Sequence, residues 1–137
     1  MPVRVFTTRV FGRFARKERL EDSKLCQAIE RAERGLVDAD LGGGLIKQRV
    51  ARRGAGRSGG YRTVIAYRTS QRSVFLYGFA KSERDNIEIR ELDVLRKLAR
   101  QYLGYNDSQI AMAIEAAELQ EVLCDEQKQD EENGQIS

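Results

Sequence analysis

Lys47 and Lys81 lie in a segment of the chain whose residue types could act on a phosphate group. Between Asp40 and Glu83 there are nine Lys or Arg residues and no carboxylate. Like charges without local counter-ions repel one another, and an anionic partner usually offsets that cost. Phosphate backbones are the commonest such partner, so the segment predicts a nucleic-acid-binding surface. The nine cations are Lys47, Arg49, Arg52, Arg53, Arg57, Arg62, Arg68, Arg72 and Lys81.

Cleavage of RNA at its own 2′-hydroxyl would need more than binding. It requires a base near that hydroxyl, cations around the phosphorus and an acid at the 5′-oxygen. The chain contains no His, the usual group for proton transfer. A lysine among arginines is a physically reasonable base, because neighbouring positive charges favour its neutral form. Lys47 and Lys81 are therefore candidates for proton transfer, and the arginines for charge stabilisation.

The glycine-rich stretch RGAGRSGG at residues 53–60 has two interpretations. Its backbone N–H groups could approach a phosphate closely, or it could be a flexible hairpin that exposes arginine. It is not a Walker A loop, since no Lys-Ser or Lys-Thr pair follows the glycines. It precedes an expected strand rather than a helix, so it does not match the dinucleotide-binding fingerprint either.

The elements expected around these residues define an α+β fold. β-Branched and alternating apolar residues predict strands at 3–7, 45–52 and 61–68, and three glycines at 42–44 predict a turn. A further strand at 73–79 is apolar on both faces, a pattern typical of a central strand covered on both sides. Apolar spacing of helical period predicts helices at 8–17, 21–35 and 83–103, and a further one beginning at Asn106 or Asp107. We expect a small, mostly antiparallel sheet with the helices packed on one face and the other face left for a ligand. In the second strand Lys47 and Arg49 should point to one side, and Ile46 and Val50 to the other.

Length and composition set further expectations. A chain of 137 residues predicts a single core, which we place in residues 1–104. Residues 105–125 would add a helix, and the acidic residues 126–137 would be disordered. Cys26 and Cys124 are expected to be buried free thiols. No stretch approaches the roughly 20 apolar residues that a membrane span needs, and without His or a Cys cluster we expect no zinc site.

Two motifs, GRSGGYR and FAKSERDNI, carry a resemblance to a known family. Over residues 3–100 the chain resembles the RelE/HigB-like toxins of bacterial type II toxin–antitoxin modules. The resemblance implies the order β-α-α-β-β-β-α and a cytoplasmic bacterial protein that cuts messenger RNA without metal or cofactor, often on the ribosome. It also implies a cognate antitoxin, often similar to a helix-turn-helix repressor, that masks the basic face and carries the pair to operator DNA.

The resemblance also assigns roles to individual residues. Arg62 matches the strand arginine that faces the scissile phosphate. Lys81, Glu83 and Arg84 match a K-x-E-R turn after the last strand. Lys47 and Arg49 are similar to basic strand residues that hold RNA. The basic charge of the segment, rather than the resemblance, leads us to expect that Arg52, Arg53, Arg57 and Arg68 bind the RNA backbone.

Two positions depart from the family pattern. Ser82 stands where the messenger-RNA cutters carry Arg, and Glu88 stands where they carry Tyr. Three functions therefore stay open: an endoribonuclease toxin, a ParE-like toxin that poisons DNA gyrase, and a non-catalytic nucleic-acid-binding co-repressor. A structural role is the alternative for each site residue: Arg62 could pair with an acidic helix, and Lys81 and Arg84 could be surface residues of a helix.

Overall fold

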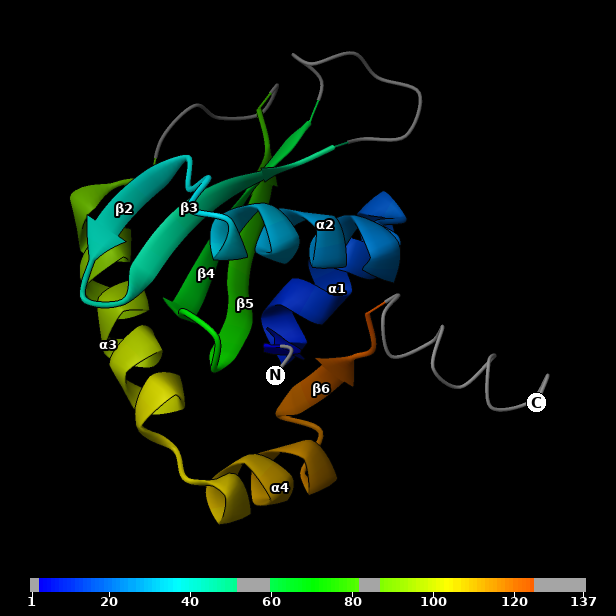
Figure 1. The fold of residues 1–137 in the computed structure, drawn as a ribbon, viewed down its shortest axis with the longest axis vertical. Helices are drawn as coiled ribbons and strands as arrows, with labels where there is room; N and C mark the ends of the chain where they lie inside the picture. The colour runs from blue at the N-terminus through cyan, green and yellow to red at the C-terminus, as the bar shows by residue number, and fades with distance from the viewer. Residues whose placement is uncertain (1–2, 52–59, 82–86, 125–137) are drawn as a thin grey trace, which may run out of the picture.

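A computed structural model describes residues 3–51, 60–81 and 87–124 of the chain. Within these residues the chain forms a six-stranded sheet and four helices, so the α+β prediction is confirmed (Figure 1). Across the sheet the strand order is β2-β3-β4-β5-β1-β6. In chain order the elements are β1 (Arg4–Thr8), α1 (Arg9–Glu18), α2 (Asp22–Glu33), β2 (Ala39–Gly42), β3 (Leu45–Val50), β4 (Tyr61–Arg68), β5 (Arg72–Ala80), α3 (Ile89–Gly104), α4 (Asp107–Glu115) and β6 (Leu119–Val122).

An antiparallel meander forms the centre of the sheet. Strands β3, β4 and β5 pair in succession, with Val50 opposite Tyr61 and Arg68 opposite Arg72. Strand β1 adds to β5 in the parallel direction, and β6 pairs antiparallel with β1. The predicted glycine turn is present, and all three of its glycines have positive φ, which other residues adopt at a cost. This turn joins β3 to β2, a strand that the sequence did not predict.

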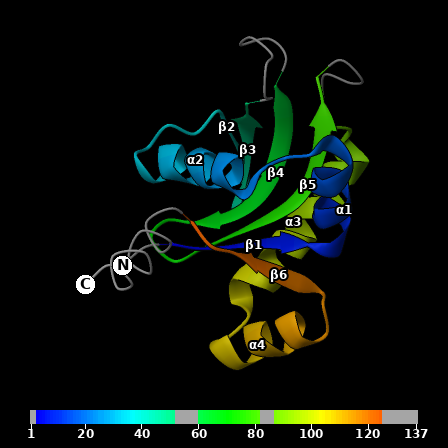
Figure 2. The ribbon, with the colours of Figure 1, turned by 90° about the vertical axis from the view of Figure 1, so that its right-hand side faces the viewer.

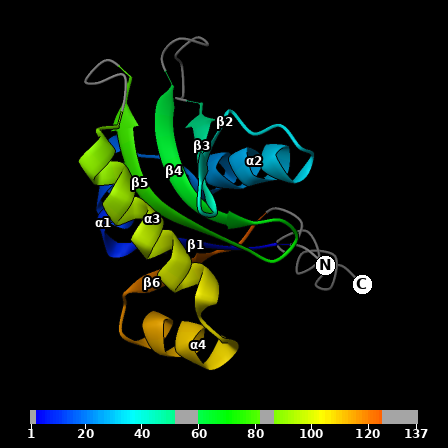
Figure 3. The same ribbon diagram turned by 90° about the vertical axis from the view of Figure 1, so that its left-hand side faces the viewer.

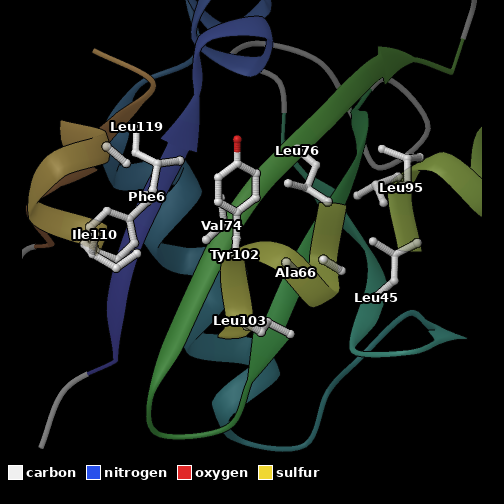
Figure 4. Packing of buried hydrophobic residues seen from close by; sticks show 13 residues of the cluster. Phe6, Leu45, Ala66, Val74, Leu76, Leu95, Tyr102, Leu103, Ile110 and Leu119 are labelled. Carbon is white, nitrogen blue, oxygen red and sulfur yellow. The ribbon is translucent and has the colours of Figure 1, made fainter. Parts of the chain in front are cut away.

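The prediction that the helices pack on one face of the sheet is wrong. Helix α2 covers one face and α3 covers the other (Figures 2 and 3). Phe11 of α1 packs with Phe75 in the core cluster on the α2 face, and Ile110 of α4 lies in the core cluster on the α3 face. The physical reason lies in β5, which is apolar on both sides. Its Phe75 belongs to the core cluster on the α2 face. Its neighbour Val74 belongs to the core cluster on the α3 face (Figure 4).

The C-terminal part of the described chain also differs from the prediction. A helix does begin where expected, because the Asn106 side chain accepts a hydrogen bond from the Gln109 amide at 2.8 Å. It ends at Glu115, however, and residues 119–122 return as β6 along the edge of β1. Residues 126–137, which we expected to be disordered, lie outside the described residues.

The two cysteines are not free thiols in this structure. Cys26 of α2 and Cys124, which follows β6, form a disulfide with their Cα atoms 5.5 Å apart. The pairing of β6 with β1 brings the end of the described chain back onto α2. The two cysteines are 98 positions apart in the sequence, and that separation gives no indication that they are in contact.

None of the helices in the described part of the chain is long and apolar enough to cross a membrane.

Candidate nucleic-acid interface

The register of the meander gathers the predicted cations on one patch of the sheet. Arg49 of β3 lies opposite Arg62 of β4, and Arg62 lies opposite Phe79 of β5. One row further on, Lys47 lies opposite Val64, which in turn lies opposite Tyr77. Directly opposed side chains have Cβ atoms about 5 Å apart, and diagonal neighbours lie roughly 7–8 Å apart. We call Lys47, Arg49, Arg62, Tyr77 and Phe79 the basic face.

The basic face occupies the half of the sheet surface beyond the main packing of α3. Nearer the other end of the same strands, Leu45, Ala66 and Val74 point to the same side and lie in the core against Leu95 and Leu103 of α3 (Figure 4). Because side chains alternate along a strand, one sheet face changes from apolar to charged as it leaves the cover of the helix. The confirmed orientation of Lys47 and Arg49, opposite in direction to Ile46 and Val50, produces this division.

Arg62 stands at the centre of the basic face. Its side chain is half-buried, and its Nη1 atom is fully buried without a hydrogen-bond partner among residues 3–51, 60–81 and 87–124. Buried polar atoms of native proteins nearly always have a partner, and a cationic donor without one carries a desolvation cost. A bound anion is the kind of partner that would remove this cost.

The electrostatics of the basic face favour an anionic ligand. Like charges directly opposite on neighbouring strands destabilise a sheet, and Arg49 and Arg62 are such a pair. Among the described residues no carboxylate lies within ion-pair distance of Lys47, Arg49 or Arg62. The charges are therefore uncompensated in the part of the chain that the structure describes.

A buried amide holds β3 in place between the two cations that it presents. Gln48 lies on the opposite side of the strand and is completely buried. Its Nε2 donates to the carbonyl oxygens of Ala28 at 2.9 Å and Leu36 at 3.2 Å, and its Oε1 accepts from the amide of Asp38 at 2.7 Å. The Asp38 carboxylate then accepts from the backbone amide of Arg49 at 2.6 Å. This network ties the backbone between Lys47 and Arg49 to α2.

Gly60 makes room for the Arg49 side chain. A Cβ atom at Gly60 would lie 2.8 Å from the carbonyl oxygen of Val50 and 3.3 Å from Cγ of Arg49. The first distance is a clash with backbone, so a side chain here would displace the start of β4 or the end of β3. The third glycine of the GRSGGYR motif thus lets the arginine stem lie close over the chain.

Two aromatic rings complete the basic face. The ring centroids of Tyr77 and Phe79 are 6.1 Å apart, and both lie beside the cations on β5. The other two strand tyrosines point to the opposite side: Tyr61 packs edge-on against Phe14, and the Tyr67 hydroxyl donates to the Glu33 carboxylate. Of these three tyrosines, Tyr77 alone stands where a base could stack near the cations.

A comparison with family models decides what kind of protein carries this surface. The model described as the RelE toxin of the RelE/RelB toxin–antitoxin system matches residues 3–122. The chain belongs to the RelE toxin family. The match runs from β1 to β6, past residue 100, where the motif-based resemblance ended. No curated protein matches the chain. The family's description implies that this RelE toxin has an antitoxin as its partner.

The structure places the remaining predicted site residues of the RelE toxin as follows. Lys81 is exposed directly after β5, two positions beyond Phe79, at the rim of the basic face. Arg68 lies six residues from Arg62, about 20 Å along β4, and donates to the carbonyl oxygen of Leu103 at 3.0 Å. It therefore binds the end of α3 and is not brought together with the others. Arg52, Arg53, Arg57 and Arg84 lie outside the described residues.

Sequence reasoning missed three contributors to the site: Phe79, Gly60 and Gln48. Strand alternation from Arg62 through the register to β5 could have found Phe79, but that register was unknown from sequence. A lone Gln at a core-facing strand position is a detectable signal for Gln48, because such an amide must find partners. Nothing short of the structure indicates that Gly60 lies against the Arg49 stem.

Glu88, one of the two departures from the family pattern, has a structural role in this toxin. It is the N-cap residue of α3, and its backbone amide donates to the Glu91 carboxylate at 3.1 Å. This is the capping-box arrangement that begins a helix. Ser82, the other departure, lies outside the described residues.

Proposed function

We propose that this RelE toxin is a metal-independent endoribonuclease that cuts messenger RNA, on or off the ribosome. The observation that carries the proposal is the buried Nη1 of Arg62 at the centre of the cationic patch. Within the described part of the chain this atom has no hydrogen-bond partner, and the patch has no carboxylate at ion-pair distance. A cation held half-buried on a rigid strand is preorganised to stabilise the extra charge of a pentavalent phosphorus. Membership of the RelE toxin family also supports an RNA-cutting function.

Each residue of the basic face has a role in this proposal. Arg62 stabilises the phosphorane, and Arg49 holds a neighbouring phosphate from the opposite strand. Of Lys47, diagonal to Arg62, and Lys81 at the rim, one takes the proton of the 2′-hydroxyl as the neutral amine. The other, as the ammonium, gives a proton to the 5′-oxygen that leaves when its bond to phosphorus breaks. The half-buried Tyr77 offers a surface for an unstacked base, and the buried Phe79 packs beside it.

The antitoxin, four further arginines and the cellular compartment complete the proposal. The antitoxin, a helix-turn-helix protein, neutralises the toxin by covering the basic face and brings the pair to operator DNA. Arg52, Arg53, Arg57 and Arg84 extend the RNA-binding surface. The toxin acts in the cytoplasm of a bacterium.

A pulse of expression without antitoxin, followed by genome-wide mapping of new RNA 5′ ends, tests this function. The parent chain should produce new ends at recurrent codon positions. Arg62→Ala should lower their yield by about 10²–10³-fold, the effect of removing one preorganised charge-stabilising donor. Arg100→Ala, which removes an exposed arginine of α3, is the matched control and should cut like the parent chain.

The other outcomes of this experiment point to the alternative functions. Growth arrest without new ends, together with trapped gyrase–DNA complexes, would replace the proposal with a gyrase poison. Neither arrest nor new ends would leave a nucleic-acid-binding co-repressor. Equal cleavage by Arg62→Ala and the parent chain would refute the role of Arg62.

A further inference from the structure

A groove lies beside the basic face, where the sheet loses a strand. Strand β1 pairs only with residues 72–75 of β5, so the second half of β5 has no strand on that side in the described chain. Helix α1 crosses there instead and leaves a cavity of about 670 Å³. Its walls come from α1, from Leu76 and Tyr77 of β5, from Leu95 and Leu98 of α3, and from the turn between α4 and β6.

The groove is apolar and open to solvent. Val10, on the α1 side, is 58% exposed, although it shares the cavity with Leu76 and Leu98. A hollow of this kind with a few polar groups at its edge is typical of a small-molecule or base site.

The polar groups of the groove are fixed in place. The Tyr102 hydroxyl donates to the Glu118 carboxylate at 3.1 Å, and burial together with that carboxylate raises the pKa of Tyr102 to about 12. The phenol therefore stays protonated, and the carboxylate keeps its remaining lone pairs for another donor. Glu118 follows Ala117, a non-glycine residue in the left-handed region with φ of 58°. Arg9 holds this turn by donating to the carbonyl oxygens of Ala116 and Ala117.

The groove is continuous with the basic face through Tyr77. Tyr77 lines the cavity, and it also lies diagonal to Arg62, roughly 7–8 Å away along the β4–β5 register. On the other side, the exposed Arg13 of α1 lies at the rim. A ligand that reaches from Arg62 into the groove therefore meets an aromatic ring, an apolar hollow, a carboxylate acceptor and a cation.

We propose that this groove is a nucleobase subsite that takes an unstacked base of the RNA strand lying on the basic face. The base stacks on Tyr77 between Val10 and Leu98, and Arg13 contacts its phosphate. Glu118 accepts a hydrogen bond from a base amino group, the donor that adenine, cytosine and guanine carry on their Watson–Crick edges and uracil lacks. The inference rests on the proposed RNA-directed function, but it needs RNA binding only, not cleavage.

Two equally exposed valines provide a matched test. Val10→Asp places a carboxylate in the groove, whereas Val94→Asp makes the same change on α3 at a residue that is also 58% exposed but does not line the cavity. The probe is a pool of ten-nucleotide single-stranded RNAs of random sequence, made uncleavable by 2′-O-methylation. At fixed salt, Val10→Asp should weaken binding by about 5- to 150-fold, the range expected for losing one stacked base. Val94→Asp should bind like the parent chain.

Sequencing of the bound fraction supplies the second readout. Glu118→Gln replaces an acceptor-only group by an amide that also donates, so the base preference at one position of the pool should change while overall affinity stays within a few fold. A change in the base found beside cleavage sites in cells would identify a messenger-RNA base. An unchanged cleavage pattern with weaker binding to ribosomal-RNA fragments would identify a ribosomal base.

Two results would overturn the subsite. One is equal affinity of the Val10→Asp and Val94→Asp variants with an unaltered base preference in Glu118→Gln. The other is normal RNA binding by Val10→Asp together with loss of neutralisation by the antitoxin, because the groove would then be a protein-docking surface. A parent chain that binds the pool with a base preference but cuts no RNA would refute the nuclease proposal and leave the subsite standing.

Discussion

Replacing Gln48 by Leu should destabilise the fold far more than any exposed Gln→Leu change. The substitution keeps the volume but removes three hydrogen bonds from a side chain with no exposed surface. The Ala28 carbonyl lies inside α2 and keeps its helical partner. The carbonyl of Leu36 and the amide of Asp38 lie in the connection to β2 and lose theirs.

The magnitude follows from these two groups. A buried backbone group left without a partner costs about 1–3 kcal/mol. Both bonds are partly buried, so water can replace some of what is lost, and we expect a total of about 2–4 kcal/mol. This is a large part of the roughly 5–15 kcal/mol that stabilises a typical domain.

Urea denaturation followed by far-UV circular dichroism measures this cost, with the slope m checked for a constant unfolding transition. Gln120→Leu on β6, where the side chain is exposed, is the control and should change stability by less than about 0.5 kcal/mol. A loss below about 1 kcal/mol in Gln48→Leu would refute the reasoning that the amide network holds β3.

Gln48→Glu separates the donor from the acceptor. A glutamate can still accept from Asp38 but cannot donate to the carbonyls of Ala28 and Leu36 while it is ionised. Burial should raise its pKa above the unfolded value, so the folded state binds the extra proton more tightly. Stability of this variant should therefore rise as the pH falls toward 4, whereas that of Gln48→Leu should not follow this pattern.

Three further predictions concern covalent structure, backbone space and ionisation. Reducing the Cys26–Cys124 disulfide should lower the free energy of unfolding by about 2–4 kcal/mol, and Cys26→Ser should abolish the response to reductant in urea titrations. Gly60→Ala should weaken RNA binding and stability through its clash with Val50, whereas Gly104→Ala, where a Cβ meets nothing within 4 Å, should be neutral or stabilising in thermal denaturation. Burial and Glu33 raise the pKa of Tyr67 from 10.0 to about 12, so the unfolded chain loses this proton at a lower pH than the folded chain does. The free energy of unfolding, measured by urea denaturation, should therefore fall between about pH 10 and 12, and Tyr67→Phe should reduce that fall.

The central fold of this toxin was predictable because its signals are local. The alternation of β3 and β4, the glycine turn before β3 and the apolar periods of α1, α2 and α3 each depend on neighbouring residues. Strands β2 and β6 escaped prediction because each has four residues, too few for a clear alternation. They form only because the longer neighbours β3 and β1 offer unpaired edges to them.

Contacts between residues far apart in the sequence were predicted poorly, because they leave no local signal. The disulfide depends on β6 returning along β1, and no feature near Cys26 or Cys124 indicates that return. The expectation of one bare sheet face failed although the sequence of residues 73–79 is apolar on both sides. A strand with Val74 on one face and Phe75 on the other requires cover on both.

The charge pattern of the sequence identifies the arginines of the site but not which of them face a ligand. Charge counting found Arg49 and Arg62 but could not separate them from Arg68, since all three are arginines of neighbouring strands. The difference arises from α3, whose C-terminal carbonyl at Leu103 binds Arg68. The basic face is therefore defined as much by the position where the helix stops covering the sheet as by the charges themselves. Arg68, under the end of α3, stabilises the fold. Arg62 lies beyond that cover, and its buried Nη1 has no hydrogen-bond partner among the described residues, which is why we propose it as the phosphate-binding group.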